Sequence, residues 1–311
     1  MTGERPVRIA ILGFGLIGGS IARAVRESAD PPELVGWSPS NSGPVAAREA
    51  GVLDAVAPSC EAALAGADLI VIAAPPLETM ELVERLGAQL RGTPAADAVV
   101  TDVASTKLRI IAAADEAGLR FVGGHPMAGR EVAGFGASDA RLFRDRPWVV
   151  VPGAATFADS AATDRVEWLA AACGARPIRM LAAEHDRAVA SISHAPLIVA
   201  AALVEAMAGG VTDQPDWPAA AELAASGWRD MTRLARGDVR MGAGIAATNA
   251  GAIGDALTRV RDVLDAWIRD LEAGKPGAVA PSAALERRFR AARDRLLAAS
   301  IGVPTLPDAT E

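Results

Sequence analysis

The chain has 311 residues, of which 51% are hydrophobic and 22% are charged, a balance typical of a globular protein with room for two domains. Its formal net charge of -7 argues against a surface that binds nucleic acid or an anionic membrane. Cys60 and Cys173 lie far apart, without a CxxC or Cys/His spacing, so we expect no disulfide, no metal site and a cytoplasmic location.

The N-terminal stretch has the pattern of a dinucleotide-binding fold. It lacks a signal-peptide h-region and enters a predicted strand at Val7–Leu12, followed by a predicted helix over Leu16–Arg26. A GxGxxG motif joins them: its first glycine allows a tight turn, its second lets a pyrophosphate approach, and its third lets helix pack on strand. The predicted cofactor contacts are Gly13, Phe14, Gly15, Leu16, Ile17 and Gly18. The alternative is a glycine-rich turn in an unrelated α/β protein.

The second predicted strand, Glu33–Trp37, bears on the choice of cofactor. NAD-binding proteins usually place Asp or Glu at its end, to hold the ribose 2′-hydroxyl. Here Ser38 follows the strand, as a further predicted cofactor contact, and the nearest arginine is Arg48. The missing carboxylate removes repulsion against a 2′-phosphate, which favours NADP over NAD. Both cofactors remain open, because the loop is simply polar.

Strands and helices alternate through the rest of the first half. The predicted elements are a helix at 45–50, a strand at 54–56, a helix at 60–65, strands at 68–74 and 98–103 with a helix at 78–89 between them, strands at 121–123 and 147–151, a helix at 163–172 and a strand at 175–180. Ala74 and Pro75 are predicted to lie beside the nicotinamide ribose, and Asp102 is another predicted cofactor contact. The alternation predicts a Rossmann-like domain over residues 1–180.

Two polar residues follow successive buried strands of this predicted sheet. Ser105 follows the strand at 98–103, and His125 follows the strand at 121–123. Ligands in doubly wound sheets bind along the carboxyl edge of the strands, so both are candidate catalytic residues. Ser105 could instead cap the helix that starts near Lys107, and His125 could be a structural histidine in a glycine-rich loop.

The second half of the chain reads as helical. A helix over 184–207 should kink at Pro196, and its apolar stretch Leu197–Val204 predicts burial against a second subunit, hence a homodimer. The run Ala195–Ala208 is too short to span a bilayer. Further expectations are a helix at 219–225, a loop at 226–233 that enters another helix, a helix at 249–271, a linker at 274–281 and a helix at 282–299. We therefore predict an all-α dimerisation domain over 181–300 and a flexible tail at 301–311.

Six motifs together resemble one family. They are GFGLIGGS at 13–20, DVASTK at 102–107, GGHPMAG at 123–129, LF…W at 142–148, EHDRAVASISH at 184–194 and GWRDMTRLA at 227–235 with Asn249. The chain resembles the prephenate/arogenate dehydrogenases, the cyclohexadienyl dehydrogenases of tyrosine biosynthesis. The resemblance implies a Rossmann-like domain followed by a helical dimerisation domain. It also implies oxidative decarboxylation of a cyclohexadienol, with hydride transfer to NAD(P).

The resemblance also assigns roles to individual residues. It implies that His125 accepts the proton of the substrate's 4-hydroxyl and that Ser105 hydrogen-bonds the same hydroxyl. It implies that Arg233 holds the ring carboxylate, a task that suits a bidentate guanidinium. Ser193 and Gly227 are the other implied substrate contacts.

Two positions depart from the family's pattern, and both bear on the substrate. Leu197 stands where many members have a substrate-contacting histidine, and Gly242 stands near the place of a tryptophan. Prephenate, arogenate and 4-amino-4-deoxyprephenate all remain candidate substrates. Glu184 and Asp186 are the candidate partners for an ammonium group of arogenate.

Two other kinds of protein share parts of this plan. One is a non-catalytic regulator that senses NAD(P), although it would be expected to lose at least one of Ser105, His125 and Arg233. The other is a β-hydroxyacid dehydrogenase or imine reductase, which usually relies on a catalytic lysine in the helical domain. No lysine occurs between Lys107 and Lys275, which counts against it.

Overall fold

The computed structural model describes residues 5–93, 95–130, 132–209, 215–272 and 283–298. By compactness the chain divides into two units, residues 1–254 and residues 255–311. The predicted domain boundaries at 180 and 300 stay predictions, because this division reflects compactness alone. The predicted linker at 274–281 and tail at 301–311 lie outside the described residues.

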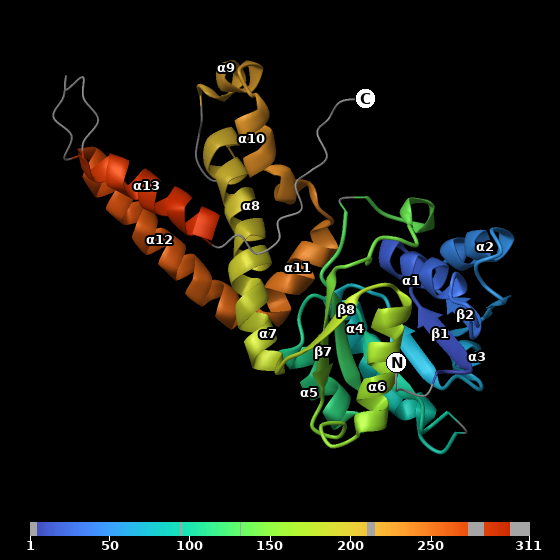
Figure 1. Ribbon diagram of the computed structural model, residues 1–311. Coiled ribbons are helices and arrows are strands. Elements are labelled where there is room, and N and C mark those ends of the chain that lie inside the picture. The colour runs from blue at the N-terminus through green and yellow to red at the C-terminus, as the bar shows by residue number, and fades with distance from the viewer. Residues whose placement is uncertain (1–4, 94, 131, 210–214, 273–282, 299–311) are drawn as a thin grey trace. The chain divides into compact units, whose positions relative to one another are not determined.

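The first unit is built around a parallel sheet (Figure 1). Its strands, in the spatial order β3-β2-β1-β4-β5, are β3 (Ala55–Val56), β2 (Glu33–Trp37), β1 (Arg8–Leu12), β4 (Leu69–Ile72) and β5 (Val99–Asp102). A second sheet has the order β6-β7-β8, with β6 (Val122–Pro126), β7 (Pro147–Pro152) and β8 (Arg176–Arg179). A parallel bridge between Val100 and Phe121 joins the two sheets, and β6 runs antiparallel to β7. The α/β prediction is confirmed.

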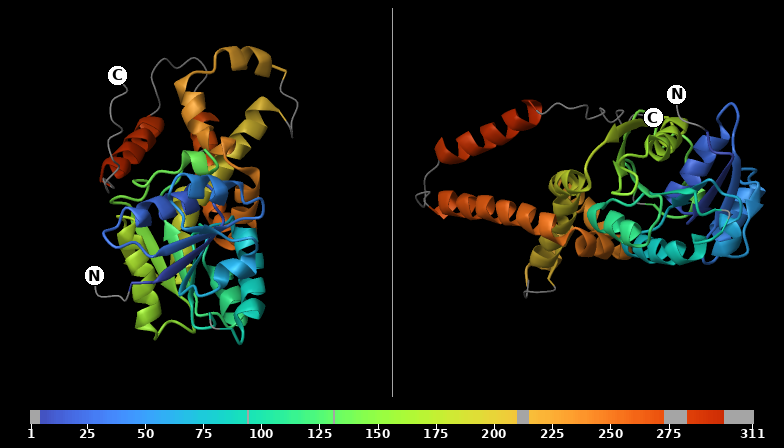
Figure 2. Two further views of the ribbon diagram at one scale, coloured as in Figure 1. Left: turned by 90° about the vertical axis from the view of Figure 1, so that its right-hand side faces the viewer. Right: turned by 90° about the horizontal axis from the view of Figure 1, so that it is seen from below.

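Helices pack on both faces of the sheet (Figures 1 and 2). They are α1 (Leu16–Arg26), α2 (Ser42–Glu49), α3 (Cys60–Leu64), α4 (Pro76–Leu90), α5 (Leu108–Glu116) and α6 (Ser160–Ala172). Along β1, Ile9 and Ile11 join the core under α1 and α6, whereas Ala10 and Leu12 join the core under α3, α4 and α5. Because successive side chains of a strand point to opposite faces, a strand buried on both faces is apolar throughout.

Only helices follow β8 in the described chain, as expected. The first is α7 (Ala182–Val189), which a π-helical turn at Ala190–His194 joins to α8 (Ala195–Ala208). Pro196 lies in the first turn of α8 and cannot donate a backbone hydrogen bond. The predicted kink is therefore a π-turn just before the proline, a common form of local helix distortion.

Helix α8 is strongly apolar yet little covered by its own chain. Only Ala195 and Ala200 of its residues are buried. Among the described residues, the continuous stretch Ala182–Ala208 is the one long and apolar enough to cross a membrane by length and composition. The helix that contains the run Ala195–Ala208 is longer than the run itself, because the π-turn joins α7 and α8 into one stretch of 27 residues.

The remaining helices differ in part from expectation. They are α9 (Trp217–Glu222), α10 (Ser226–Met231), a 3-10 turn at Arg233–Arg236, α11 (Val239–Thr248), α12 (Ala250–Glu272) and α13 (Ala283–Ala298). Most of the loop expected at 226–233 is helical instead: α10 covers Ser226–Met231, and the Thr232 hydroxyl donates to the carbonyl of Trp228 at 2.7 Å. Within the second unit, α12 and α13 meet through the rings of Trp267 and Phe289, whose centroids are 4.8 Å apart.

Candidate active site

One edge of the parallel sheet collects the predicted site. Leu12 pairs with both Trp37 and Ile72, and Ile72 pairs with Asp102, so β1, β2, β4 and β5 end at the same level. The chain that follows each strand therefore emerges at one edge, which is where doubly wound sheets bind ligands. The predicted residues there are Gly13, Ser38, Ala74, Pro75 and Ser105.

The turn between β1 and α1 has the shape of a diphosphate cradle. Gly13 has a φ of +101°, and a Cβ there would lie 2.2 Å from the carbonyl oxygen of Ala73, so only glycine fits. A Cβ on Gly18 would lie 2.2 Å from the carbonyl oxygen of Gly13. Beside Gly15, by contrast, nothing lies within 4 Å, and no side chain caps α1. The open backbone at this helix N-terminus fits a dinucleotide diphosphate.

The other predicted cofactor contacts in this region mainly shape the cradle. Phe14 and Leu16 are buried and Ile17 is half-buried. The ring centroid of Phe14 lies 6.1 Å from that of Phe135, so the turn packs against the 3-10 turn at Phe135–Ala137. After β4, the Thr79 hydroxyl donates to the carbonyl of Ala74 at 3.0 Å, and Pro75 is the N-cap of α4.

The loop after β2 is held by an asparagine. Asn41, at φ +54°, accepts a hydrogen bond from the Ser38 N–H at 2.8 Å and donates to the carbonyl of Ala57 at 2.8 Å. Arg48 donates instead to the carbonyl of Leu53 at 3.1 Å. Its guanidinium is thus used within its own turn, and the loop offers hydroxyl and backbone groups without a carboxylate.

A buried ion pair, which the sequence did not reveal, organises the end of β5. Lys107 and Asp102 are both fully buried and their side chains pair directly. The Asp102 carboxylate also accepts from the N–H of Ala104 at 3.0 Å and of Gly124 at 3.2 Å. Burial raises the pKa of Asp102 and lowers the pKa of Lys107, and their mutual attraction opposes both shifts. The Asp102 side chain therefore braces β5 against β6, rather than presenting its carboxylate to a cofactor.

His125 lies inside β6, opposite Val149, and not in a loop after the strand as expected. Its Nδ1 is 2.8 Å from Nε2 of His185, a residue 60 positions later whose side chain is buried. Burial, and then the neighbouring His185, Lys107 and His194, lower the pKa of His125 well below 6.5. The imidazole is therefore neutral at pH 7, as a general base must be.

Ser105 presents an unpartnered hydroxyl. Its Oγ is buried and has no hydrogen-bond partner in the described part of the chain. The alternative that it caps the next helix is wrong, because Lys107 is the N-cap of α5 and no side chain caps that helix. Buried hydroxyls are normally hydrogen-bonded, so the unused Oγ of Ser105 suits a ligand.

The third histidine, His194, is fully buried beside the same cluster. Its Nδ1 lies 3.1 Å from Nδ2 of Asn249, which donates to the carbonyl of Asp186 at 2.8 Å. Burial lowers the pKa of His194 to about 4. His194 thus connects α8 to α7 through Asn249.

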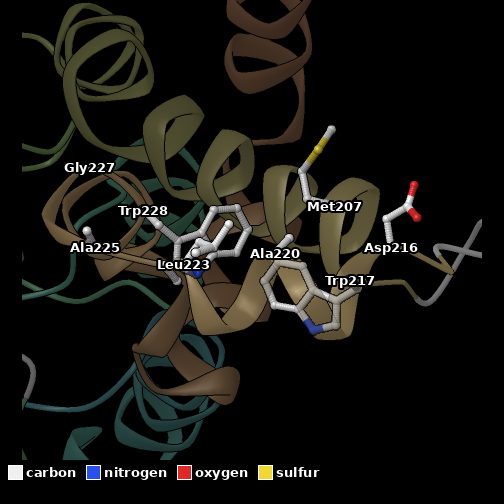
Figure 3. A pocket seen from close by; sticks show the side chains of 9 residues that line it. Met207, Asp216, Trp217, Ala220, Leu223, Ala225, Gly227 and Trp228 are labelled. Atoms are coloured by element: carbon white, nitrogen blue, oxygen red, sulfur yellow. The ribbon is translucent and has the colours of Figure 1, made fainter.

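The three implied substrate contacts lie on other elements. Ser193 is in the π-turn, Gly227 in α10 and Arg233 in the following 3-10 turn, and all three are exposed. None is a hydrogen-bond partner of His125 among the described residues. Gly227 lines a separate open hollow of about 550 Å³, in which the rings of Trp217 and Trp228 lie 5.1 Å apart (Figure 3).

Comparison with known proteins decides the family. Residues 21–179 match the family model described as prephenate dehydrogenase, nucleotide-binding domain, and residues 181–276 match prephenate dehydrogenase, dimerization domain. The chain belongs to the prephenate dehydrogenase family. A prephenate dehydrogenase of Bacillus subtilis is 33% identical over 269 residues, which are 85% of this chain and 68% of that protein.

Solved structures of the same family share its fold. Synechocystis arogenate dehydrogenase is 30% identical, covers 93% of this chain and 99% of its own, and superposes with a TM-score of 0.73. The prephenate dehydrogenase of A. aeolicus, in complex with hydroxyphenyl propionate and NAD+, is 24% identical, with a TM-score of 0.81 over 94% of this chain and 97% of its own. This member of the prephenate dehydrogenase family is thus a dehydrogenase with a nucleotide-binding domain for NAD(P).

The two departures from the family's pattern adjoin in space. A Cβ placed on Gly242 in α11 would lie 3.9 Å from Cδ2 of Leu197 in α8. An isobutyl group and a bare backbone thus meet at one spot, where the family resemblance leads us to expect an imidazole and an indole. Nothing in the sequence links these two positions, because they lie 45 positions apart.

Proposed function

We propose that the protein oxidises and decarboxylates prephenate to 4-hydroxyphenylpyruvate with NAD(P), as a step of tyrosine biosynthesis. One observation carries the proposal: a neutral imidazole at His125 and an unused buried hydroxyl at Ser105 lie at the edge that carries the diphosphate cradle. A substrate alcohol can donate to the imidazole while it bonds the serine. The name of the Bacillus subtilis relative supports prephenate as the substrate.

Each proposed residue has a defined task in this reaction. NAD(P), held in the diphosphate cradle, would supply the oxidant that this reaction needs, as the acceptor of a hydride from ring carbon C4. His125 accepts the proton of the hydroxyl on that carbon, so the O–H electron pair can form a carbonyl; such help is typically worth about 10²–10⁴-fold. As CO₂ leaves, its bonding pair enters the ring, which becomes aromatic, and the proton returns to the phenol oxygen. Arg233 holds the ring carboxylate, and Ser193 and Gly227 complete the substrate contacts.

The choice between prephenate and arogenate depends on a partner for an ammonium group. Asp186 was one candidate, but its carboxylate is buried and accepts from the backbone N–H groups of Lys107 and Leu108. The other candidate, Glu184, is exposed on α7. The engagement of Asp186 favours the keto acid prephenate. The likeness to Synechocystis arogenate dehydrogenase keeps arogenate as the first alternative.

The cofactor preference follows from the loop after β2. Its hydroxyl and backbone groups carry no charge that would repel a 2′-phosphate, which favours NADP. The nearest cation, Arg48, donates to the carbonyl of Leu53 and is not available to pair with a 2′-phosphate. The A. aeolicus structure contains NAD+. We therefore propose that both dinucleotides bind, with NADP preferred.

We further propose that the protein is a cytoplasmic homodimer. The uncovered apolar surface of α8 and the match to a dimerization domain support the dimer. Leu203, half-buried on α8, offers a test: Leu203→Asp should yield monomers in sedimentation velocity, whereas a dimer of unchanged affinity would contradict the proposed interface.

The decisive assay follows reduced nicotinamide by absorbance. Prephenate, arogenate and 4-amino-4-deoxyprephenate are each offered with NAD and with NADP. Turnover of prephenate is expected, and His125→Asn should lower kcat by orders of magnitude while the dissociation constant of the dinucleotide changes little. Turnover of the amino-deoxy substrate alone would move the protein to secondary metabolism. Cofactor binding without turnover of any substrate would favour a non-catalytic regulator.

A further inference from the structure

A line of hydrogen bonds leads from His125 to a buried carboxylate. His125 Nδ1 lies 2.8 Å from His185 Nε2, and His185 Nδ1 lies 2.8 Å from Oδ1 of Asp186. The two imidazole rings are nearly perpendicular, at 79°. His185 and Asp186 are 1% and 3% exposed, so water does not compete for these bonds.

Asp186 is an anion that can only accept. It accepts from the N–H groups of Lys107 at 2.8 Å and Leu108 at 2.9 Å, at the start of α5, where a helix favours negative charge. Burial alone would raise its pKa, but the hydrogen bonds from His185, Leu108 and Lys107 outweigh burial and lower it. An ionised carboxylate has no proton to donate, so Nδ1 of His185 carries the hydrogen of that bond.

The direction of the next bond follows. A neutral imidazole has one donor and one acceptor nitrogen. With its proton on Nδ1, His185 must accept at Nε2, so Nδ1 of His125 donates. The acceptor of His125 is then Nε2, which has no hydrogen-bond partner among the described residues.

We propose that Asp186 and His185 are positioning residues that fix His125 as the Nδ1–H tautomer, with Nε2 as the atom that takes the substrate's hydroxyl proton. This deepens the proposed function and rests on it. When the substrate O–H bond breaks and the Nε2–H bond forms, the new imidazolium keeps its Nδ1–H bond to His185. The Asp186 carboxylate, one ring further on, stabilises that positive charge.

The direct test reads the tautomer without any substrate. The chain has only three histidines, so ¹⁵N-histidine labelling of the full-length protein gives three ring systems, assigned by His125→Asn and His194→Gln. Long-range ¹H–¹⁵N correlation spectra at pH 7 should show His125 protonated at Nδ1 and bare at Nε2. A proton on Nε2 instead would overturn the proposal.

Asp186→Asn gives the functional test. An amide can donate to His185 and so reverse both bonds, and the equivalent change in serine proteases costs about 10⁴ in kcat. Through an additional ring we expect a fall in kcat of at least about tenfold, a smaller change in KM and a shift of His125 towards the Nε2–H tautomer. Unchanged kcat and an unchanged tautomer would refute the positioning role.

A matched control separates this role from mere support of the helix. Asp115, near the other end of α5, also accepts from backbone N–H groups, those of Ala154 at 3.2 Å and Ala155 at 3.5 Å. Asp115→Asn should leave the tautomer and kcat unaltered, and both variants should bind dinucleotide as the parent does. If no substrate turns over, the proposed function fails while the tautomer still decides this inference. Turnover with a proton on Nε2 of free His125 retains the function and rejects the inference.

Discussion

Acid should destabilise the protein partly through His194. Burial lowers the pKa of this side chain from 6.5 to about 4, although the carboxylate of Asp186 opposes the shift. Between those two pKa values the unfolded chain binds a proton that the folded protein does not bind. The stability is therefore fully present above pH 6.5 and is lost as the pH falls towards 4. Between pH 7 and pH 5, this one group should remove about 2 kcal/mol of the free energy of unfolding.

Urea unfolding of the parent and of His194→Gln at pH 7, 6 and 5 isolates this effect. His125, whose pKa burial also lowers, titrates in both proteins and largely cancels in the comparison. The glutamine keeps a polar partner for Asn249 but cannot be protonated in this range. The variant should therefore lose about 2 kcal/mol less than the parent between pH 7 and pH 5. Equal losses, within about 0.5 kcal/mol, would refute the reasoning.

Three further predictions follow from the site. Lys107→Met should cost about 3–5 kcal/mol of the free energy of unfolding, because it leaves Asp102 charged and buried. Adding Asp102→Asn should recover part of this loss. A cost of Lys107→Met below about 1 kcal/mol in urea unfolding would contradict a stabilising ion pair. Gly13→Ala should destabilise the fold by about 1–3 kcal/mol. Gly15→Ala, with open space at its Cβ, should keep the stability of the parent and weaken dinucleotide binding in a fluorescence titration. Equal stability of the two variants would contradict the different roles of these glycines. Arg233→Ala should raise KM for prephenate at least about tenfold with cofactor affinity unchanged, and an effect on cofactor affinity alone would displace the residue from the substrate site.

The sequence predicted the first half of the fold well because its signals are local. A buried parallel strand such as Leu69–Ile72 is apolar throughout, and GxGxxG places three glycines where the turn needs them. Helix α11 lacked such a signal except for Asp238, whose side chain accepts from the N–H of Met241 at 2.8 Å. The fold class was therefore within reach, and the boundaries of short helices were not.

The candidate site could be predicted only where one residue sufficed. His125 follows an apolar run and precedes a proline, a pattern visible within ten residues. Its partner His185 comes 60 residues later on a helix, and periodicity says nothing about which strand that helix will meet. Asp186 drew notice only as a charge that could face an ammonium group. Its actual use, at the start of α5, depends on tertiary packing.

The hydrogen bonds and the ion pair around His125 form a ring of interactions that starts and ends at Asp102, and this ring links folding to chemistry. Asp102 pairs with the side chain of Lys107, and the backbone N–H of Lys107 donates to Asp186. Asp186 holds His185, which holds His125, and Gly124 beside it donates back to Asp102. The interactions that dock α7 on the sheet are thus the same ones that orient the base. The carboxylates of Asp102 and Asp186 each take part both in docking α7 and in orienting the His125 imidazole. A substitution that loosens the packing of α7 on α5 should therefore lower the free energy of unfolding and, at the same time, shift His125 away from the Nδ1–H tautomer.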